Sequence, residues 1–219
     1  MVSYLMDICN NLNPNIPENA AILTCFTTAF WGTTWLSKVT VPRLDGFNPT
    51  IHVKTSDIQH GVQDHNNLEE MVISLPWTKV AKEKGEKIFW TKQDGIIDLH
   101  AALENHLKIN NPLADGHLFA FKHKNTMWPM TRYVFLSGIH KIVAAKKLPK
   151  LTSHSIHVGS TLEYLLRGIP FNIVKAKGHW QSEAFKGYLR KHAQIMAPYM
   201  QTELKTYKTS VRYAMPPVW

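Results

Sequence analysis

The spacing of the apolar residues changes twice along this chain, and that change limits the folds that the chain can adopt. From Asn19 to Thr40 apolar residues recur at helical spacing as far as Gly32, which predicts a buried helix and a turn, with Glu18 or Asn19 as N-cap. Short runs rich in β-branched and aromatic residues come next, and polar or glycine-containing stretches separate them. They predict three strands of a small antiparallel sheet, at 51–58, 69–78 and 86–92.

Helical spacing returns beyond the third of these runs. An aliphatic stripe in 98–110 predicts a helix, and Ser153 is suited to cap a later one. The expected helices are 98–110, 132–145, 153–166, 171–177 and 181–191. The pattern predicts one α+β domain that is mainly α, with its sheet in the N-terminal third.

Charge and cysteine content narrow the class of protein. The chain has 25 Lys and Arg against 16 Asp and Glu, a formal net charge of +9, which favours a polyanionic partner such as nucleic acid. Its two cysteines, Cys9 and Cys25, are too few for a disulfide framework or a four-cysteine metal site, so a reducing compartment is expected. No export signal and no membrane span are expected, because the N-terminal segment lacks a basic start and a long apolar run.

A set of histidine, tyrosine and lysine residues recurs at characteristic spacings along the chain. His154 and His157 lie three residues apart at the start of a predicted helix, and a Gly-His-Trp sequence follows at 178–180. Tyr188 comes ten residues after the glycine, and Lys79 lies in the connection between the second and third predicted strands. This order resembles the catalytic domain of the tyrosine recombinases, the phage-integrase family, and the similarity runs from Asn19 to Gln201.

Longer segments make the resemblance more specific. The sequences TTAFWGTTWLSKVTVPRLD, GSTLEYLLRGIPFNIVKAKG and YLRKHAQIMAPYMQ are similar to recombinase domains that fungal transposon-derived genes encode. The resemblance implies a recombinase-like catalytic domain at 19–201, an N-terminal remnant at 1–18 and a C-terminal tail at 202–219. It also implies that the separate core-binding domain of the family is absent.

The resemblance assigns chemical roles to individual residues. Tyr188 matches the nucleophile that attacks a DNA phosphodiester, and Lys79 matches the general acid that protonates the leaving 5′-oxygen. His154 matches the first residue of a His-x-x-Arg pair, and His179 a later histidine or tryptophan position. Because a phosphotyrosine intermediate conserves the energy of the broken bond, no metal and no organic cofactor are implied.

Both arginine positions of the family carry other residues. The family's approximate Ala-Arg-Leu-Gly-Glu turn is replaced by TTWLSK, which puts Trp35 at the first position, and HSIH puts His157 at the second. Arginine offers a planar charged fork that matches two phosphate oxygens, whereas imidazole is shorter and indole is uncharged. Lys38, three residues beyond Trp35, is a possible substitute, but a lysine lacks the bidentate geometry with which arginine binds two phosphate oxygens. Since one lost transition-state donor costs roughly 100- to 1,000-fold in rate, we expect strand cleavage to be abolished or badly weakened.

The expected partner is DNA, held mainly through its phosphates and therefore in a salt-dependent way. The basic residues expected to contact DNA are Lys38, Lys175, Lys177, Arg190 and Lys191. A homo-oligomer on DNA, a nuclear location and no membrane association are further expectations.

Two other classes of function are compatible with the same residues. One is a non-enzymatic DNA-binding module or a mobile-element relic. The other is a metal-dependent hydrolase in which His154, His157 and His179 bind zinc. No glutamate directly follows His154 to complete a His-Glu-x-x-His motif, so the recombinase interpretation explains the spacing better.

Overall fold

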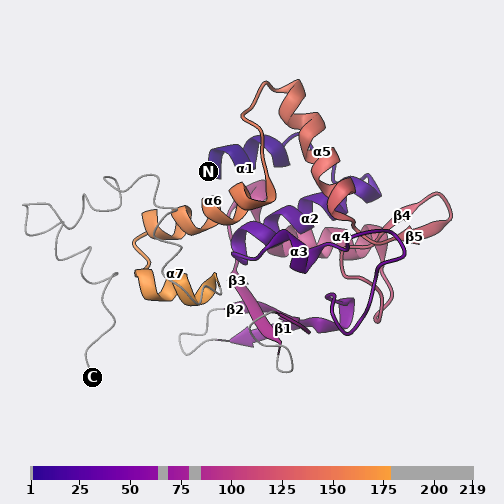
Figure 1. The fold of residues 1–219 in the computed structure, drawn as a ribbon, viewed down its shortest axis with the longest axis horizontal. Coiled ribbons are helices and arrows are strands. Elements are labelled where there is room, and N and C mark those ends of the chain that lie inside the picture. Colours follow the sequence, from indigo (N-terminus) through magenta and orange to yellow (C-terminus); the bar gives the residue numbers. More distant parts are fainter. Residues whose placement is uncertain (1, 64–68, 79–84, 179–219) are drawn as a thin grey trace, which may run out of the picture.

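A computed structural model describes residues 2–63, 69–78 and 85–178, and it shows helices gathered beside a small sheet (Figure 1). The helices are α1 (Val2–Cys9), α2 (Pro17–Trp31), α3 (Leu36–Val39), α4 (Leu99–Asn110), α5 (Arg132–Ala145), α6 (Ser153–Leu166) and α7 (Phe171–Lys177). The strands are β1 (Ile58–Gln63), β2 (Glu69–Leu75), β3 (Glu86–Thr91), β4 (Phe121–His123) and β5 (Thr126–Trp128). The 3-10 turns η1 (Thr55–Asp57) and η2 (Gly95–Ile97) complete the described elements.

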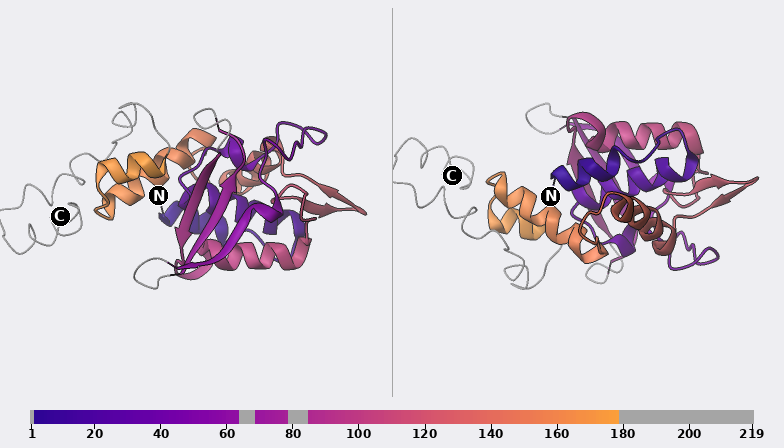
Figure 2. Two further views of the ribbon diagram at one scale, coloured as in Figure 1. Left: turned by 90° about the horizontal axis from the view of Figure 1, so that it is seen from below. Right: turned by 90° about the horizontal axis from the view of Figure 1, so that it is seen from above.

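Helix α2 lies at the centre of the fold. Every residue from Ala20 to Trp31 is buried, because α4 and α5 pack against different sides of it (Figure 2). A helix that is apolar all round is one that other elements surround. Neither Glu18 nor Asn19 is its N-cap: Ile16 holds that position and Pro17 opens the helix. Proline is well suited to the first helical position, where its missing N–H leaves no bond unmade.

The three-stranded sheet is antiparallel, in the order β1-β2-β3. Alternate residues of β2 and β3 face the helices, so Met71 pairs with Trp90 and Ile73 with Ile88, and all four are buried in the main core. The predicted strands at 69–78 and 86–92 are confirmed as β2 and β3. Burial alternates along β3, whereas in β2 Val72 is buried as well as Met71 and Ile73.

The first predicted strand, at 51–58, is wrong except for its last residue, since β1 begins at Ile58. Residues 55–57 form the turn η1 instead, in which the Asp57 carboxylate accepts a hydrogen bond from the Lys54 backbone N–H at 2.8 Å. A side chain that binds nearby backbone competes with strand pairing.

The helices predicted after the sheet are confirmed where the structure describes them, at α4, α5, α6 and α7. Asp98 caps α4 by accepting from the backbone N–H groups of His100 and Ala101. Ser153 is not the cap of α6, because Thr152 is: its hydroxyl accepts from the Ser155 backbone N–H at 3.1 Å. The helix predicted at 181–191 lies outside the described residues.

Helix α1 and the hairpin of β4 and β5 have no counterpart among the predicted elements. Helix α1 falls in the segment 1–18, and its Leu5, Ile8 and Cys9 are buried in the same core as α2. Strands β4 and β5 form a hairpin of three paired residues on each side. The fold class is as predicted, mainly α with a small three-stranded antiparallel sheet. No helix in the described ranges combines the length and apolar character needed to span a bilayer.

Candidate functional site

The two residues assigned to the arginine positions lie against each other. Trp35 is the residue just before α3, and His157 lies in the second turn of α6. Their rings are stacked, with centroids 4.1 Å apart and planes inclined by only 15°. His157 is fully buried and Trp35 is half-buried, so the indole covers the imidazole. Residues from opposite halves of the sequence therefore form one aromatic contact.

His154 stands beside this pair. It lies one helical turn before His157, where residues three apart share a helix face. Its ring is stacked on Trp35 with a centroid distance of 5.9 Å and an interplanar angle of 26°, and its side chain is exposed. The structure thus brings together three residues that the sequence separated, and we call Trp35, His154 and His157 the aromatic stack.

Hydroxyl groups of α6 hold the stack in place by binding the end of α2. The last carbonyls of a helix have no partner within the helix. Ser160 donates to the Phe30 carbonyl, and its hydroxyl lies 2.8 Å from that of Thr33. Tyr164 donates to the Trp31 carbonyl at 2.7 Å. Because α6 caps α2 in this way, His157 of α6 is held next to Trp35, which follows the turn at the end of α2.

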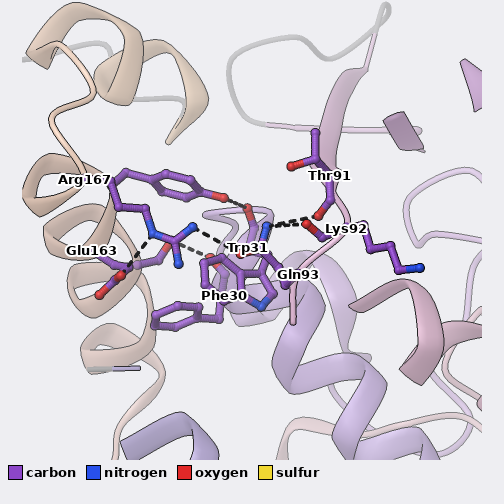
Figure 3. Close-up of polar contacts among 9 residues, drawn as sticks. Phe30, Trp31, Thr91, Lys92, Gln93, Glu163 and Arg167 are labelled. Atoms are coloured by element: carbon purple, nitrogen blue, oxygen red, sulfur yellow. Dashed lines mark hydrogen bonds and ion pairs between the residues drawn. The ribbon is translucent and has the colours of Figure 1, made fainter. Parts of the chain in front are cut away.

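Arg167 joins the far end of α6 to the same junction (Figure 3). Its guanidinium contacts the Glu163 carboxylate and the Gln93 side-chain oxygen, each at 3.1 Å, and lies 4.7 Å above the Trp31 ring. A guanidinium over an indole adds a cation–π attraction to these bonds. Arg167 therefore links α6 to α2 and to the segment after β3.

Two predicted DNA-contacting lysines hold their ammonium groups against aromatic rings of the protein. Lys38 donates to the Trp77 carbonyl at 3.3 Å and lies 4.6 Å from the centre of that ring. Lys177 donates to the Phe89 carbonyl at 2.7 Å and lies near the rings of Phe89 and Tyr164. Burial lowers the pKa of Lys177 to about 8, although the charge of Glu70 opposes the shift. Lys175 is half-buried on the same helix.

The remaining site predictions fall on residues whose positions the structure does not describe. These are Lys79, His179, Tyr188, Arg190 and Lys191. Within the described ranges, no group of three His, Cys, Asp or Glu side chains is arranged to hold a metal ion.

A basic surface on α5 was not among the sequence predictions, although the sequence contains its signal. Residues 116–162 include no aspartate or glutamate but seven lysines and arginines: Lys122, Lys124, Arg132, Lys141, Lys146, Lys147 and Lys150. Arg132 and Lys141 line a groove of about 790 Å³ along α5, together with Tyr133, which is 79% exposed. The Arg132 guanidinium also donates to the Ser153 hydroxyl at 2.9 Å, next to His154. The basic surface therefore adjoins the aromatic stack.

Comparison with known proteins identifies the fold. No family model and no curated protein matches the chain. Among solved structures, one described as FLP Recombinase-Holliday Junction Complex I shares 15% identity over 83% of this chain and 44% of that chain, with a TM-score of 0.52. A Flpe-Holliday Junction Complex shares 15% identity over 97% of this chain and 51% of that chain, with a TM-score of 0.53. This chain spans about half the length of each recombinase. The protein therefore has the tyrosine-recombinase fold.

Proposed function

We propose that this protein is a DNA-binding domain of tyrosine-recombinase type in which strand cleavage by Tyr188 is severely impaired. The observation that carries the proposal is the contact between Trp35 and His157 at a centroid distance of 4.1 Å. The proposal joins this contact to the roles that the family resemblance assigns.

The contact supports the assignment of both positions together. Two arginines that clamp one phosphate must lie side by side, and Trp35 and His157, which take their places in the resemblance, are in van der Waals contact. Rings at this distance leave no room for a phosphate between them. The indole has a single N–H donor and no charge, and a neutral imidazole also has a single donor. Neither side chain supplies the bidentate, permanently charged fork of arginine.

The proposed defect concerns the transition state rather than the nucleophile. Attack by the Tyr188 hydroxyl forms the bond from its oxygen to phosphorus and breaks the bond to the 5′-oxygen, which takes up a proton. Negative charge then accumulates on the non-bridging phosphate oxygens, where preorganised donors contribute most to the rate. With the clamp replaced by the aromatic stack, this charge lacks its two cationic partners. His154, exposed beside the stack, lacks the planar guanidinium fork that matches two phosphate oxygens.

DNA binding is supported by charge rather than by the stack. The acid-free segment 116–162 places exposed Arg132 and Lys141 along one groove and exposed Lys146, Lys147 and Lys150 beyond it. A surface of positive charge attracts a polyanion and repels basic partners. The solved structures with this fold are described as complexes with Holliday junctions, which are DNA. We therefore assign α5 and the loop after it to the DNA-binding surface.

Reversing one charge on α5 tests this surface. We expect Lys141→Glu to weaken binding to duplex DNA and to make the plot of log affinity against log salt concentration less steep by about 0.9, the loss of one phosphate contact. Gel shifts or fluorescence anisotropy at several salt concentrations measure the slope. The matched control is Lys108→Glu, an equal charge change on exposed α4, which packs on a different side of α2. Equal effects of the two substitutions would mean that only net charge matters.

A nicked suicide duplex, which traps a cleaved strand, tests the impaired cleavage. Duplexes are drawn from a pool enriched for binding to the protein. We expect no covalent protein–DNA adduct above the level of the Tyr188→Phe variant, as judged by denaturing gels. Rapid accumulation of an adduct that Tyr188→Phe abolishes would sink the proposed impairment, while leaving the DNA-binding surface untouched.

A further inference from the structure

One tyrosine on α5 lies outside the core of the fold. Tyr133 is 79% exposed, although its side chain carries a large apolar ring. The two other tyrosines in the described ranges, Tyr4 and Tyr164, pack against the main core, and each donates a hydrogen bond to a backbone carbonyl. Tyrosine is enriched at binding surfaces because its ring offers a large apolar contact and its hydroxyl tolerates water. The position of Tyr133 is therefore suited to contact with a partner.

Tyr133 begins a stripe of residues along the groove of α5. From this residue on, the side chains of α5 that line the groove recur at the spacing of one helix face: Tyr133, Leu136, Ser137, His140, Lys141 and Ala144. A different face of the same helix is buried in the main core through Phe135, Ile139 and Val143. Helix α5 thus turns a second, partly apolar face to the solvent.

Positive charges lie along this stripe. Arg132 immediately precedes Tyr133, and Lys141 follows eight residues later, about two helical turns along α5. Both cationic side chains are exposed, and no described residue that lines the groove is acidic. His140 already donates through Nε2 to the Leu151 carbonyl at 2.8 Å, so the charge of the groove comes from Arg132 and Lys141. The groove therefore combines an aromatic ring and apolar walls with two cations.

A nucleotide with an unpaired base matches these features. Grooves that hold single strands combine positive charge along the backbone with aromatic side chains on which bases stack. In an intact duplex the neighbouring bases cover both faces of a base, and extruding it costs free energy. The groove, at about 790 Å³, is far larger than the cavity of about 150 Å³ that holds benzene, so a base with its sugar fits. The exposed ring of Tyr133 thus favours a base that is already unpaired.

We propose that the groove along α5 binds an unpaired DNA base, which stacks on the ring of Tyr133 while Arg132 and Lys141 bind phosphates of the same strand. The inference rests on the DNA-binding surface of the proposed function and adds the class of DNA that this surface prefers. Unpaired bases occur in single strands and in bulges of a duplex, and the two sources share this chemistry. The cations select a polyanion, and the ring selects its bases.

The affinities of the full chain for an oligothymidine strand and for a blunt duplex of the same length test this preference. We expect Tyr133→Leu to lower the ratio of single-strand to duplex affinity about tenfold, the effect of one stacked base. The matched control, Tyr133→Phe, keeps the ring and loses only the hydroxyl, so it should keep the native ratio. Fluorescence anisotropy at one salt concentration measures both affinities. Because Tyr133 is exposed, both variants are expected to fold.

Photocrosslinking of the native chain shows where the base lies. A strand that carries 5-iodouracil couples on irradiation to an aromatic side chain stacked on that base, and we expect mass spectrometry to find the crosslink on Tyr133. A duplex with a single 5-iodouracil bulge distinguishes the two sources of the unpaired base. A Tyr133 crosslink to the bulge supports a bulged duplex as a ligand, whereas a Tyr133 crosslink to the single strand alone supports single strands.

Different results would overturn this inference and the proposed function. An unchanged affinity ratio in Tyr133→Leu, or an equal fall in Tyr133→Phe, overturns the stacking of a base on Tyr133, even where Lys141→Glu weakens duplex binding as expected. A single strand that does not bind, or that crosslinks only to other residues, overturns it too. Binding of the single strand that depends on the Tyr133 ring, without any binding of the duplex, supports the inference and contradicts the duplex-binding surface.

Discussion

Arginine at both positions of the stacked pair, Trp35→Arg with His157→Arg, is expected to raise the rate of covalent adduct formation on a nicked suicide duplex by about 100-fold or more. The two guanidinium groups would stand where the stacked rings now touch, and together they would neutralise the phosphate oxygens in the transition state. Each single substitution should give much less, because residues that act as one clamp are not additive.

Two measurements make this result interpretable. Adduct formation in the double variant should disappear when Tyr188→Phe is added, which identifies the nucleophile. Without DNA the paired guanidinium groups lack a counter-charge, and the site of His157 is fully buried, so the melting temperature should fall. DNA should restore part of it, because a ligand stabilises the state that it binds. A folded double variant that binds DNA yet gains no adduct would contradict the assignment of these positions.

Trp31→Ala is expected to lower the free energy of unfolding by about 4 kcal/mol, a large part of the stability of an ordinary domain. The indole is fully buried, and its N–H donates to the Ile97 carbonyl at 2.8 Å. Truncation would leave a cavity, an unpaired carbonyl and an Arg167 guanidinium without the ring that it now covers. The loss falls at the junction of α2, α6 and the segment after β3, which positions the aromatic stack.

Urea unfolding followed by circular dichroism measures this loss. The control is Tyr164→Phe, which removes only the hydroxyl that donates to the Trp31 carbonyl, and it should cost about 1 kcal/mol. A Trp31→Ala variant as stable as this control would mean that the junction is not central to the fold.

Much of the fold could be predicted from local patterns, and the exceptions have physical causes. The helices α5, α6 and α7 have the predicted bounds, and α7 ends at the glycine signal of Gly178. The strand predicted at 51–58 failed because the Asp57 side chain binds local backbone and forms a turn. Helix α1 and the short hairpin of β4 and β5 depend on packing against the core, which a local pattern does not encode.

The candidate site, too, could be predicted from the sequence only in part. Family resemblance assigned Trp35 and His157 to the arginine positions, but it did not predict that they stack, because contact between distant segments depends on tertiary packing. The absence of acidic residues from 116–162 can be seen in the sequence when the positions of Asp and Glu are considered as well as their total number.

The contact between Trp35 and His157 also bears on how such a site changes over generations. If Trp35 and His157 hold the two arginine positions, a single arginine there puts a charge without a counter-charge into a buried or half-buried site and leaves the clamp incomplete. Such a single-arginine chain would be less stable and would not cleave DNA faster. Since neighbouring residues couple in their effects, the two substitutions are favourable only together. Under the proposed function, this coupling makes the loss of the phosphate clamp easier to reach than to reverse.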